Sequence, residues 1–244
     1  MMNAAGLAFR FRVFIFLLLY LIGFLAPWEF RSGHHDTLWL AASTLLARSG
    51  WISLATATVT VTLMSLTCLV MGAVLRVWGT AYLGSGVMRG AAMQGDQFVA
   101  AGPYRYVRNP LYLGSWLLAI GVSVLMPPSG AVFFLVAFTV FTLLLISAEE
   151  RFLSAKQGDV YQQYRQSVPR LWPRMASGEA ASPAGHPRWV QAFLAETYPV
   201  AITLCFGVLA WRYNARILVR CVLICYGISL VVRALTSEGS QGGV

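Results

Sequence analysis

Residues 111–148 read LYLGSWLLAIGVSVLMPPSGAVFFLVAFTVFTLLLISA, and this apolar block decides the fold class. The block is too long for one crossing of a bilayer, because a hydrocarbon core of about 30 Å takes roughly 20 apolar residues per helix. Residues 127–130, Pro-Pro-Ser-Gly, interrupt it. Tandem proline removes two backbone donors and disfavours helix immediately before it. We therefore expect two apolar helices joined as a tight hairpin.

Further apolar windows lie on both sides of the hairpin. Residues 11–28 and 52–75 precede it, and residues 190–211 and 215–235 follow it. Together with the two arms of the hairpin, these windows predict about six transmembrane spans. The segment 37–47 is too short to cross comfortably, so we interpret it as interfacial or as a lead-in to the second span.

The composition supports an all-α, polytopic membrane helical bundle. Hydrophobic residues make up 58% of the chain and charged residues 11%, against roughly one quarter charged in a soluble domain. The net charge of +9 is spread over loops, so it indicates contact with anionic lipid headgroups and no nucleic acid partner. The cysteines, Cys68, Cys205, Cys221 and Cys225, all fall inside predicted spans and indicate packing rather than a metal site.

Charge orients the expected spans. Residues 76–108 carry four arginines against one acid, and residues 149–188 carry six basic residues against four acids. Six spans place both segments and both termini on one side, and the basic excess predicts that this side is cytoplasmic, in a plasma membrane of the bacterial inner-membrane kind. The expected divisions of the chain are N-terminal spans (1–75), a core (76–175), a linker (176–188), C-terminal spans (189–236) and a flexible tail (237–244).

Polar residues gather first in GPYRYVRNPLYLG, residues 102–114. Asn109 suits the N-cap of a helix, and Pro110 suits its first position. The N-terminus of that helix favours a carboxylate or a phosphate. The segment also offers aromatic hydroxyls and fixed cations on Tyr104, Tyr106, Tyr112, Arg105 and Arg108. Taken singly, each of these fits an ordinary aromatic belt and a basic loop equally well.

The second polar cluster begins at Glu149 and Glu150, which end a long apolar window. Two carboxylates are costly there unless a cation is close. Arg151 is one candidate for that cation, and a cationic ligand is the other. S-adenosylmethionine fits both clusters, because its amino and sulfonium groups attract carboxylates and its carboxylate attracts arginine or a helix N-terminus. The glycine-rich segment 84–86 follows no strand pattern, so we set aside a soluble-type nucleotide fold.

As an ordered set, these motifs resemble a known family. GPYRYVRNPLYLG is followed across the hairpin by the glutamate pair, by G-x-x-Y-x-x-Y from Gly158, and by VPRLWP at residues 168–173. This order resembles the isoprenylcysteine carboxyl methyltransferase family, to which phospholipid N-methyltransferases are related. The resemblance covers roughly residues 76–173. It implies a membrane methyltransferase that uses S-adenosyl-L-methionine on a lipid-like or isoprenoid substrate.

The resemblance also assigns site residues. It implies cofactor contacts from the tyrosine of G-x-Y, from the four residues before that loop, from the R-H-P-x-Y motif and from the first glutamate. Including the adjacent arginine, these are Asp96, Gln97, Phe98, Val99, Tyr104, Arg108, Asn109, Pro110, Leu111, Tyr112 and Glu149. We assign Glu150, Arg105 and Arg170 as candidate catalytic residues, and we expect no metal.

Two positions depart from the family pattern. The family histidine is Asn109, which can hydrogen-bond and cap but cannot titrate near neutrality. The family arginine that holds a substrate carboxylate, one turn before the cofactor glutamate, is Leu145. A free prenylcysteine carboxylate therefore loses its expected partner. Two alternatives stay open: a membrane reductase of sterol-like lipids that uses NADPH, and a non-catalytic membrane subunit.

Overall fold

The computed structural model describes residues 11–25, 36–83, 99–174, 186–212 and 224, and every regular element within these residues is helical. The all-α prediction is therefore confirmed for this part of the chain. The elements are α2 (Arg12–Leu25), α3 (Leu38–Arg48), α4 (Leu54–Leu83), the 3-10 turn η1 (Gly102–Arg105), α6 (Pro110–Ser123), α7 (Pro128–Ser167), α8 (Trp189–Ala195) and α9 (Thr197–Arg212).

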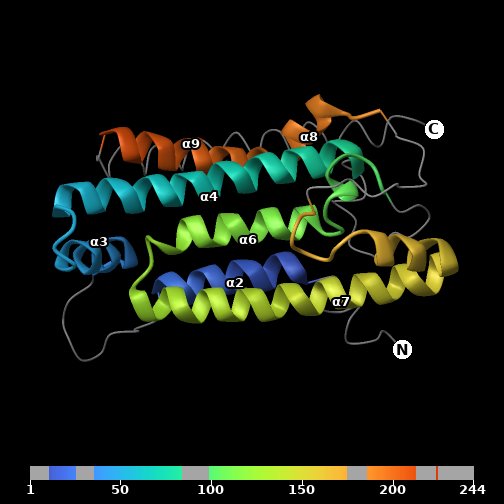
Figure 1. Cartoon of the computed structure of the whole chain (residues 1–244), viewed down its shortest axis with the longest axis horizontal. Helices are drawn as coiled ribbons and strands as arrows, with labels where there is room; N and C mark the ends of the chain where they lie inside the picture. The colour runs from blue at the N-terminus through green and yellow to red at the C-terminus, as the bar shows by residue number, and fades with distance from the viewer. Residues whose placement is uncertain (1–10, 26–35, 84–98, 175–185, 213–223, 225–244) are drawn as a thin grey trace.

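The longer helices lie side by side along one axis (Figure 1). Helix α6 packs between α4 and α7, α2 packs against α7, and α9 packs along α4. Helix α3 and the α6–α7 turn form one end of the bundle, and η1 lies at the other end, where α7 also ends its apolar stretch (Figure 1). The antiparallel α6–α7 pair thus brings residues just before α6 close to the glutamates of α7.

The predicted hairpin is confirmed. Helix α6 ends at Ser123 and α7 begins at Pro128, after Pro127 in an extended conformation. The backbone N–H groups of Leu38 and Trp39 donate to carbonyls in this turn, those of Met126 and Val124, at 2.7 and 2.8 Å. The segment 37–47 therefore forms a helix of its own, which covers the far end of the hairpin.

Small residues bring α4 and α6 into close contact. A Cβ placed on Gly72 would lie 2.7 Å from the carbonyl oxygen of Gly114, and one placed on Gly121 would lie 2.5 Å from Leu69. The Ser65 hydroxyl donates to the Gly121 carbonyl at 2.7 Å. Glycine lets helix backbones approach closely where packing, rather than burial from water, drives their association. The α4–α6 contact depends on this approach.

The predicted count of six spans is not confirmed. Within the described residues, α4 and α7 are long and apolar enough to cross a membrane, and α8 with α9 could form a third span that bends by 70°. Helices α2 and α6 are apolar but have 14 residues each, fewer than the roughly 20 that a crossing needs. The window 215–235 lies outside the described residues except for Ile224.

Helix α7 continues past the expected end of its apolar window and then reverses. Gly158 has φ 55° and ψ −132°, a backbone conformation that suits glycine and breaks the helix. Arg165 Nη1 lies 3.4 Å from Ser154 Oγ, whereas eleven residues of straight helix would separate them by about 16 Å. The chain therefore turns back on itself at Gly158.

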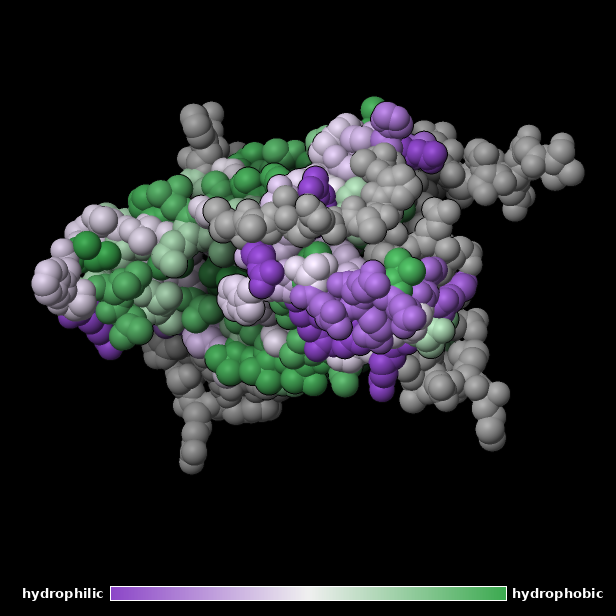
Figure 2. All heavy atoms as spheres, turned by 45° about the vertical axis from the view of Figure 1, so that its right-hand side comes forward, coloured by the Kyte–Doolittle hydropathy of each residue, from purple (hydrophilic) through white to green (hydrophobic). Residues whose placement is uncertain are grey.

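The reversal leaves a polar end on an otherwise apolar bundle. Figure 2 shows hydrophilic residues gathered over the second half of α7. Exposed polar residues there include Arg151, Lys156, Asp159, Gln162 and Arg165. Between Ala131 and Glu150, the exposed side chains on α7 are apolar and include Val132, Val136, Val140 and Leu144. The described surface is thus divided between a polar end and apolar sides.

We expect Gly72→Ala to lower the free energy of unfolding by about 1–3 kcal/mol, because the new Cβ meets a backbone carbonyl that cannot move alone. Gly207→Ala is the matched control, since its nearest neighbour would be a Leu66 methyl at 4.0 Å. Thermal unfolding in detergent measures both. Equal melting temperatures for the two variants would contradict the close α4–α6 contact.

Candidate functional site

The loop of residues 99–109 is held against the end of α4. Gly102 has φ 59°, and a Cβ there would lie 2.5 Å from the ring of Tyr82. The turn η1 follows, with the Tyr104 side chain buried. The ring of Tyr106 lies 6.2 Å from the ring of Trp78 on α4, centroid to centroid. These contacts place Tyr104 inside the bundle end rather than on its surface.

A second segment, residues 168–174, runs along this loop, and we call it the strap. The Arg108 N–H donates to the Pro169 carbonyl at 2.9 Å, and the Arg174 N–H donates to the Tyr106 carbonyl at 3.1 Å. Tyr164, just before the strap, donates its hydroxyl to the Tyr104 carbonyl at 2.8 Å. Loop and strap are therefore joined by backbone hydrogen bonds.

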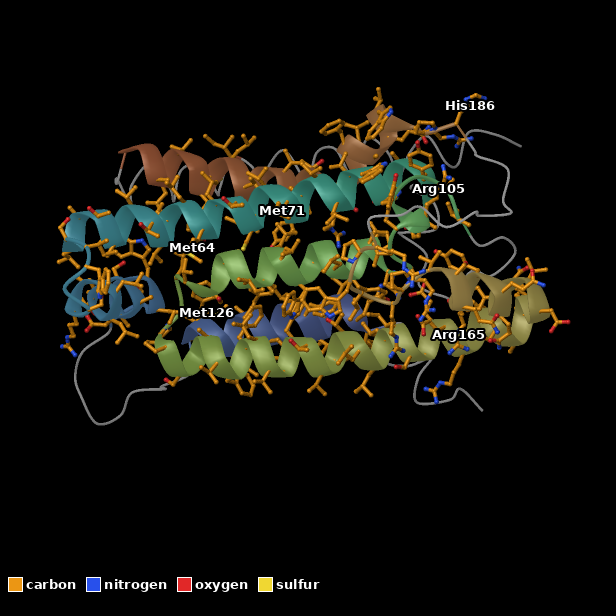
Figure 3. The ribbon with its side chains drawn as sticks, in the orientation of Figure 1. Met64, Met71, Arg105, Met126, Arg165 and His186 are labelled. Atoms are coloured by element: carbon orange, nitrogen blue, oxygen red, sulfur yellow. The ribbon has the colours of Figure 1, made fainter. Side chains whose placement is uncertain are left out.

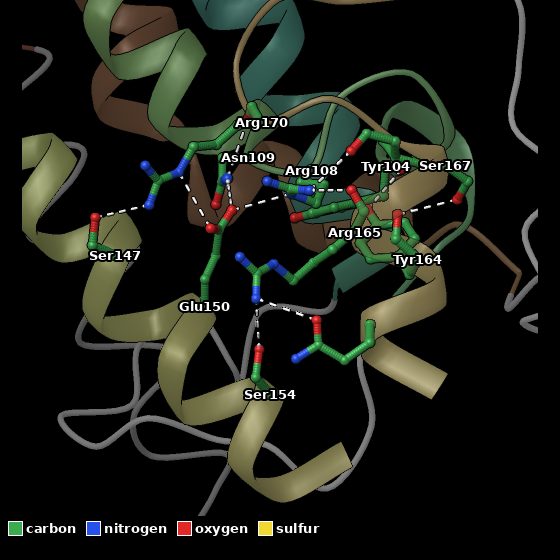
Figure 4. Close-up of polar contacts among 12 residues, drawn as sticks. Tyr104, Arg108, Asn109, Ser147, Glu150, Ser154, Tyr164, Arg165, Ser167 and Arg170 are labelled. Carbon is green, nitrogen blue, oxygen red and sulfur yellow. Dashed lines mark hydrogen bonds and ion pairs between the residues drawn. The ribbon is translucent and has the colours of Figure 1, made fainter. Parts of the chain in front are cut away.

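The buried carboxylate of Glu150 connects loop, strap and α7 (Figure 4). Its Oε1 accepts from Arg108 Nε at 3.1 Å and from Asn109 Nδ2 at 3.2 Å. Its Oε2 lies 3.2 Å from Arg170 Nε, an ion-pair distance without hydrogen-bond geometry. Arg170 Nη2 also donates to Ser147 at 2.8 Å. Glu150 is only 5% exposed, and these charged partners compensate its desolvation.

The same cluster corrects two expectations. Asn109 stands at the N-cap of α6, but its side chain makes no capping bond; it donates to Glu150 and to the Arg170 carbonyl, each at 3.2 Å. A buried carboxylate needs donors more than an accessible helix end does. Arg151, the local candidate for the cation beside the glutamates, instead donates to the Ser147 carbonyl. Arg108 and Arg170 are the cations at Glu150.

The surroundings of Glu149 differ from those of Glu150, because adjacent residues on a helix are about 100° apart. The Tyr112 hydroxyl hydrogen-bonds to its carboxylate, and Arg12 of α2 is a nearby positive charge. The Tyr104 hydroxyl is buried without a hydrogen-bond partner. Burial raises the pKa of this phenol well above its ordinary value, and the Glu149 charge adds to the rise. Tyr104 therefore offers a neutral hydroxyl close to a carboxylate.

Sequence reasoning missed a second buried ion pair. Arg76 Nε and Nη2 donate to the two carboxylate oxygens of Glu196 at 2.7 and 3.1 Å. The Thr80 hydroxyl donates to Glu196 at 2.7 Å, and Arg76 Nη1 donates to Ser115 at 2.5 Å. The pair joins α4 and α6 to the junction of α8 and α9. A signal was present, because Glu196 is the one charged residue in the window 190–211, and charges at such depth come with partners.

The remaining assigned residues are distributed as follows. Asp96, Gln97 and Phe98 lie outside the described residues. Val99 begins the loop and is half-buried, Pro110 opens α6, and Leu111 packs against Gly79 of α4. Arg105 is exposed on η1 (Figure 3), and it is not among the described partners of Glu150. The structure thus brings together Glu149, Tyr104 and Tyr112 on one side, and Glu150, Arg108, Asn109 and Arg170 on the other.

Leu145 is fully packed, at 1% exposed. It lies four residues before Glu149 and therefore shares its helix face. Arg170 contacts Ser147 and Glu150, on a different face. Arg170 therefore does not replace the arginine that is missing at position 145.

The donor set suits a cationic ligand of the S-adenosylmethionine kind. Glu149 supplies negative charge, and a carboxylate has about four lone-pair sites, of which Tyr112 uses one. The unpartnered hydroxyl of Tyr104 supplies a hydrogen bond in the same region. An orphaned buried hydroxyl is rare in folded proteins and indicates a ligand-binding or strained position.

Comparison with known proteins agrees with the motif resemblance. Residues 60–159 match the family model described as "Phospholipid methyltransferase". A relative named "Methanethiol S-methyltransferase 2", from Bradyrhizobium diazoefficiens, is 38% identical over 104 residues, which is 43% of this chain and 39% of the relative. The predicted resemblance to the isoprenylcysteine carboxyl methyltransferase family and the related phospholipid methyltransferases is confirmed. No solved structure matches the chain significantly.

Two other relatives carry similar names. The "Methanethiol S-methyltransferase" of Crocosphaera subtropica is 41% identical over 70 residues, 29% of this chain and 27% of the relative. The "Protein-S-isoprenylcysteine O-methyltransferase" of Schizosaccharomyces pombe is 40% identical over 73 residues, 29% of this chain and 30% of the relative. All three relatives are named methyltransferases, and the similarity spans less than half the length of each.

We expect Glu196→Gln to destabilise the protein by about 3–5 kcal/mol, because the Arg76 guanidinium is left buried without its carboxylate. The double variant Arg76→Met/Glu196→Leu should lose much less than the sum of its single variants, since both charges are removed together. Thermal unfolding in detergent measures the cycle, with Asp159→Asn as an exposed control. Additive losses would show that the two side chains are not coupled.

Proposed function

We propose that this chain is an integral membrane methyltransferase that uses S-adenosylmethionine as its methyl donor. One observation carries the proposal: the buried Tyr104 hydroxyl has no hydrogen-bond partner and lies within electrostatic range of the Glu149 carboxylate. Both residues belong to the region that is similar to methyltransferases. Glu149 would hold the cationic end of the cofactor, and Tyr104 would hydrogen-bond to it. Asp96, Gln97, Phe98 and Val99 complete the cofactor site by resemblance.

The chemistry asks mainly for positioning. When bound, S-adenosylmethionine supplies an electrophilic methyl group on a sulfonium, and the transfer is an in-line displacement that needs no covalent intermediate on the protein. Orientation of the reactants and exclusion of water supply most of the acceleration in such reactions. The buried side chains of Leu145 and Ile146 keep the α7 wall beside Glu149 dry. Glu150, Arg108 and Arg170 act as positioning residues that hold the loop and Tyr104 in place.

The proposed topology keeps about six spans, with the site on the cytoplasmic side of a bacterial inner membrane. The polar end around residues 151–167 fits the aqueous side, and the apolar flanks of α4 and α7 fit lipid (Figure 2). The basic excess in the segments that flank the site favours the cytoplasm. The cofactor would enter from that side, and a lipid-like acceptor would enter sideways between helices.

We expect Glu149→Gln to weaken the binding of S-adenosylhomocysteine by about tenfold or more, because a charge-assisted hydrogen bond contributes about 1.5–3 kcal/mol. Tyr104→Phe should weaken binding less, since it removes one neutral hydroxyl. Calorimetric titration of detergent-solubilised protein measures both. Asp159→Asn, which changes an exposed acid just beyond the break at Gly158, is the control and should bind normally.

Unchanged affinity in well-folded Glu149→Gln protein would remove the central assignment. Titration of the same preparation with NADPH tests the alternative of a sterol-like reductase. Binding of NADPH without binding of S-adenosylhomocysteine would favour that reductase, and binding of neither would favour a non-catalytic subunit.

The proposed acceptor is a neutral or amine headgroup, or a thiol, on an apolar tail. Leu145 occupies the position where a substrate carboxylate would need a cation, and Arg170 is engaged with Glu150 and Ser147. An unpaired charge at membrane depth costs about 2.5–3.5 kcal/mol even on lenient scales. The methanethiol methyltransferase relatives are named for a thiol acceptor, which agrees with an uncharged reacting group.

We expect labelled methyl groups to appear on membrane lipid extract rather than on the carboxylate of a farnesylcysteine analogue. Scintillation counting after extraction, with base hydrolysis to release methyl esters, separates these products. Efficient ester formation on farnesylcysteine would refute the acceptor assignment. In that case Arg12, the positive charge near Glu149, would be the candidate partner of the substrate carboxylate.

A further inference from the structure

An apolar groove lies between α4 and the bent pair α8–α9. Helices α8 and α9 lie outside the residues that match the methyltransferase family model. Its volume is about 430 Å³, within the range of about 300–1,000 Å³ that small-molecule sites occupy. The lining includes Val74, Val77 and Trp78 of α4, Trp189 and Phe193 of α8, and Leu204 of α9. These side chains carry no charge.

The surface that lines the groove is almost entirely apolar. Its one hydroxyl, on Thr203, donates to the carbonyls of Pro199 and Leu69 at 2.9 and 3.3 Å. A cofactor or a charged headgroup would lose its hydrogen bonds to water there and gain none from the lining, which is unfavourable. A hydrocarbon chain has no polar atoms to leave unpaired. The apolar lining therefore favours a hydrocarbon chain as the ligand.

A buried ion pair maintains the shape of this groove. The groove lies in the angle of 70° between α8 and α9, and Glu196 stands between the two helices, 1% exposed. Arg76 and Thr80 of α4 hold that carboxylate. Charges at membrane depth are expensive and mark function more often than packing. The bend between α8 and α9 is thus bound to α4 through Glu196, the residue at which the bend occurs.

The groove also adjoins the candidate site. Trp78, one of its lining residues, is in ring contact with Tyr106 at 6.2 Å, and Tyr106 follows Tyr104 by two residues. We infer that the groove holds the isoprenoid or acyl chain of the methyl acceptor, which places the reacting headgroup beside the cofactor loop. This inference rests on the proposed methyltransferase function, and it gives the C-terminal helices a role in substrate selection.

The expected benefit of the groove is orientation. A chain that moves from lipid into an apolar groove gains little hydrophobic free energy, because lipid tails are as apolar as the lining. Holding the chain does restrict where its headgroup can lie, and orientation of this kind is a large source of rate acceleration. The groove should therefore matter for chain-bearing acceptors and be irrelevant to binding of the cofactor.

The test is photolabelling of the full chain in phospholipid nanodiscs. The probe is a farnesyl thioether that carries a diazirine on its chain and a neutral amide headgroup. We expect saturable labelling of residues 70–78 and 189–204, mapped by mass spectrometry. Val74→Trp fills the groove and should raise the half-saturating probe concentration about tenfold or more. Val136→Trp on α7 is the matched control, since the two valines are 58% and 60% exposed, and it should not change the labelling.

Two results would overturn the inference. One is unchanged labelling in Val74→Trp. The other is labelling that does not saturate and falls equally on residues 132–144 of α7, which would mean that ordinary bilayer lipid covers the groove. Titration of the same nanodiscs with S-adenosylhomocysteine separates the two proposals: its binding should be equal in both tryptophan variants. Saturable labelling without that binding would refute the proposed function and the acceptor assignment with it.

Discussion

Two guanidinium groups from different segments, those of Arg108 and Arg170, share one buried carboxylate, that of Glu150. Glu150 or Arg108 alone would be a costly buried charge, because desolvation of an ion inside a protein costs several kcal/mol. Together with the amide of Asn109, they compensate one another. Since they come from the loop before α6, from the strap and from α7, the position of each segment depends on the other two. The candidate site has its shape because this contact is satisfied.

The neighbouring glutamates show how one helical step separates two tasks. Glu150 is surrounded by donors and has little capacity for a ligand. Glu149, about 100° around the helix, has the Tyr112 hydroxyl as its described hydrogen-bond partner and lies within electrostatic range of the Tyr104 hydroxyl. A rigid, neutralised carboxylate thus stands next to one that can respond to a cationic ligand. Pre-organisation of this kind reduces the reorganisation that binding requires.

Short sequence patterns predicted the features that depend on neighbouring residues alone, such as turns and helix starts. The proline pair predicted the turn between α6 and α7, and Pro110 predicted the start of α6. The sequence could not reveal partners that meet across the fold. Asn109 has the residue type of a helix cap, yet its amide goes to a carboxylate 41 residues away. The helix lengths were also misjudged, because hydropathy windows do not show where an apolar helix stops.

The pairing of Arg76 with Glu196 illustrates the same limit more strongly. The two residues are 120 positions apart, and each ends or interrupts an apolar window without any local complement. Composition predicts that such charges need partners, but only the packing of α4 against the α8–α9 junction decides which partner each one finds. Features set by chain topology therefore need three-dimensional information, even where the motifs are specific.

The reversal at Gly158 has a consequence for how this region tolerates changes in length. Seven residues, 151–157, separate Glu150 from Gly158, and seven residues make close to two full helical turns. Deleting or inserting one of them would rotate the returning helix by about 100°. The carbonyls of Arg165 and Val168, which accept from Arg108, would then point elsewhere. This stretch can vary in sequence on its exposed face, but it tolerates neither an insertion nor a deletion of one residue.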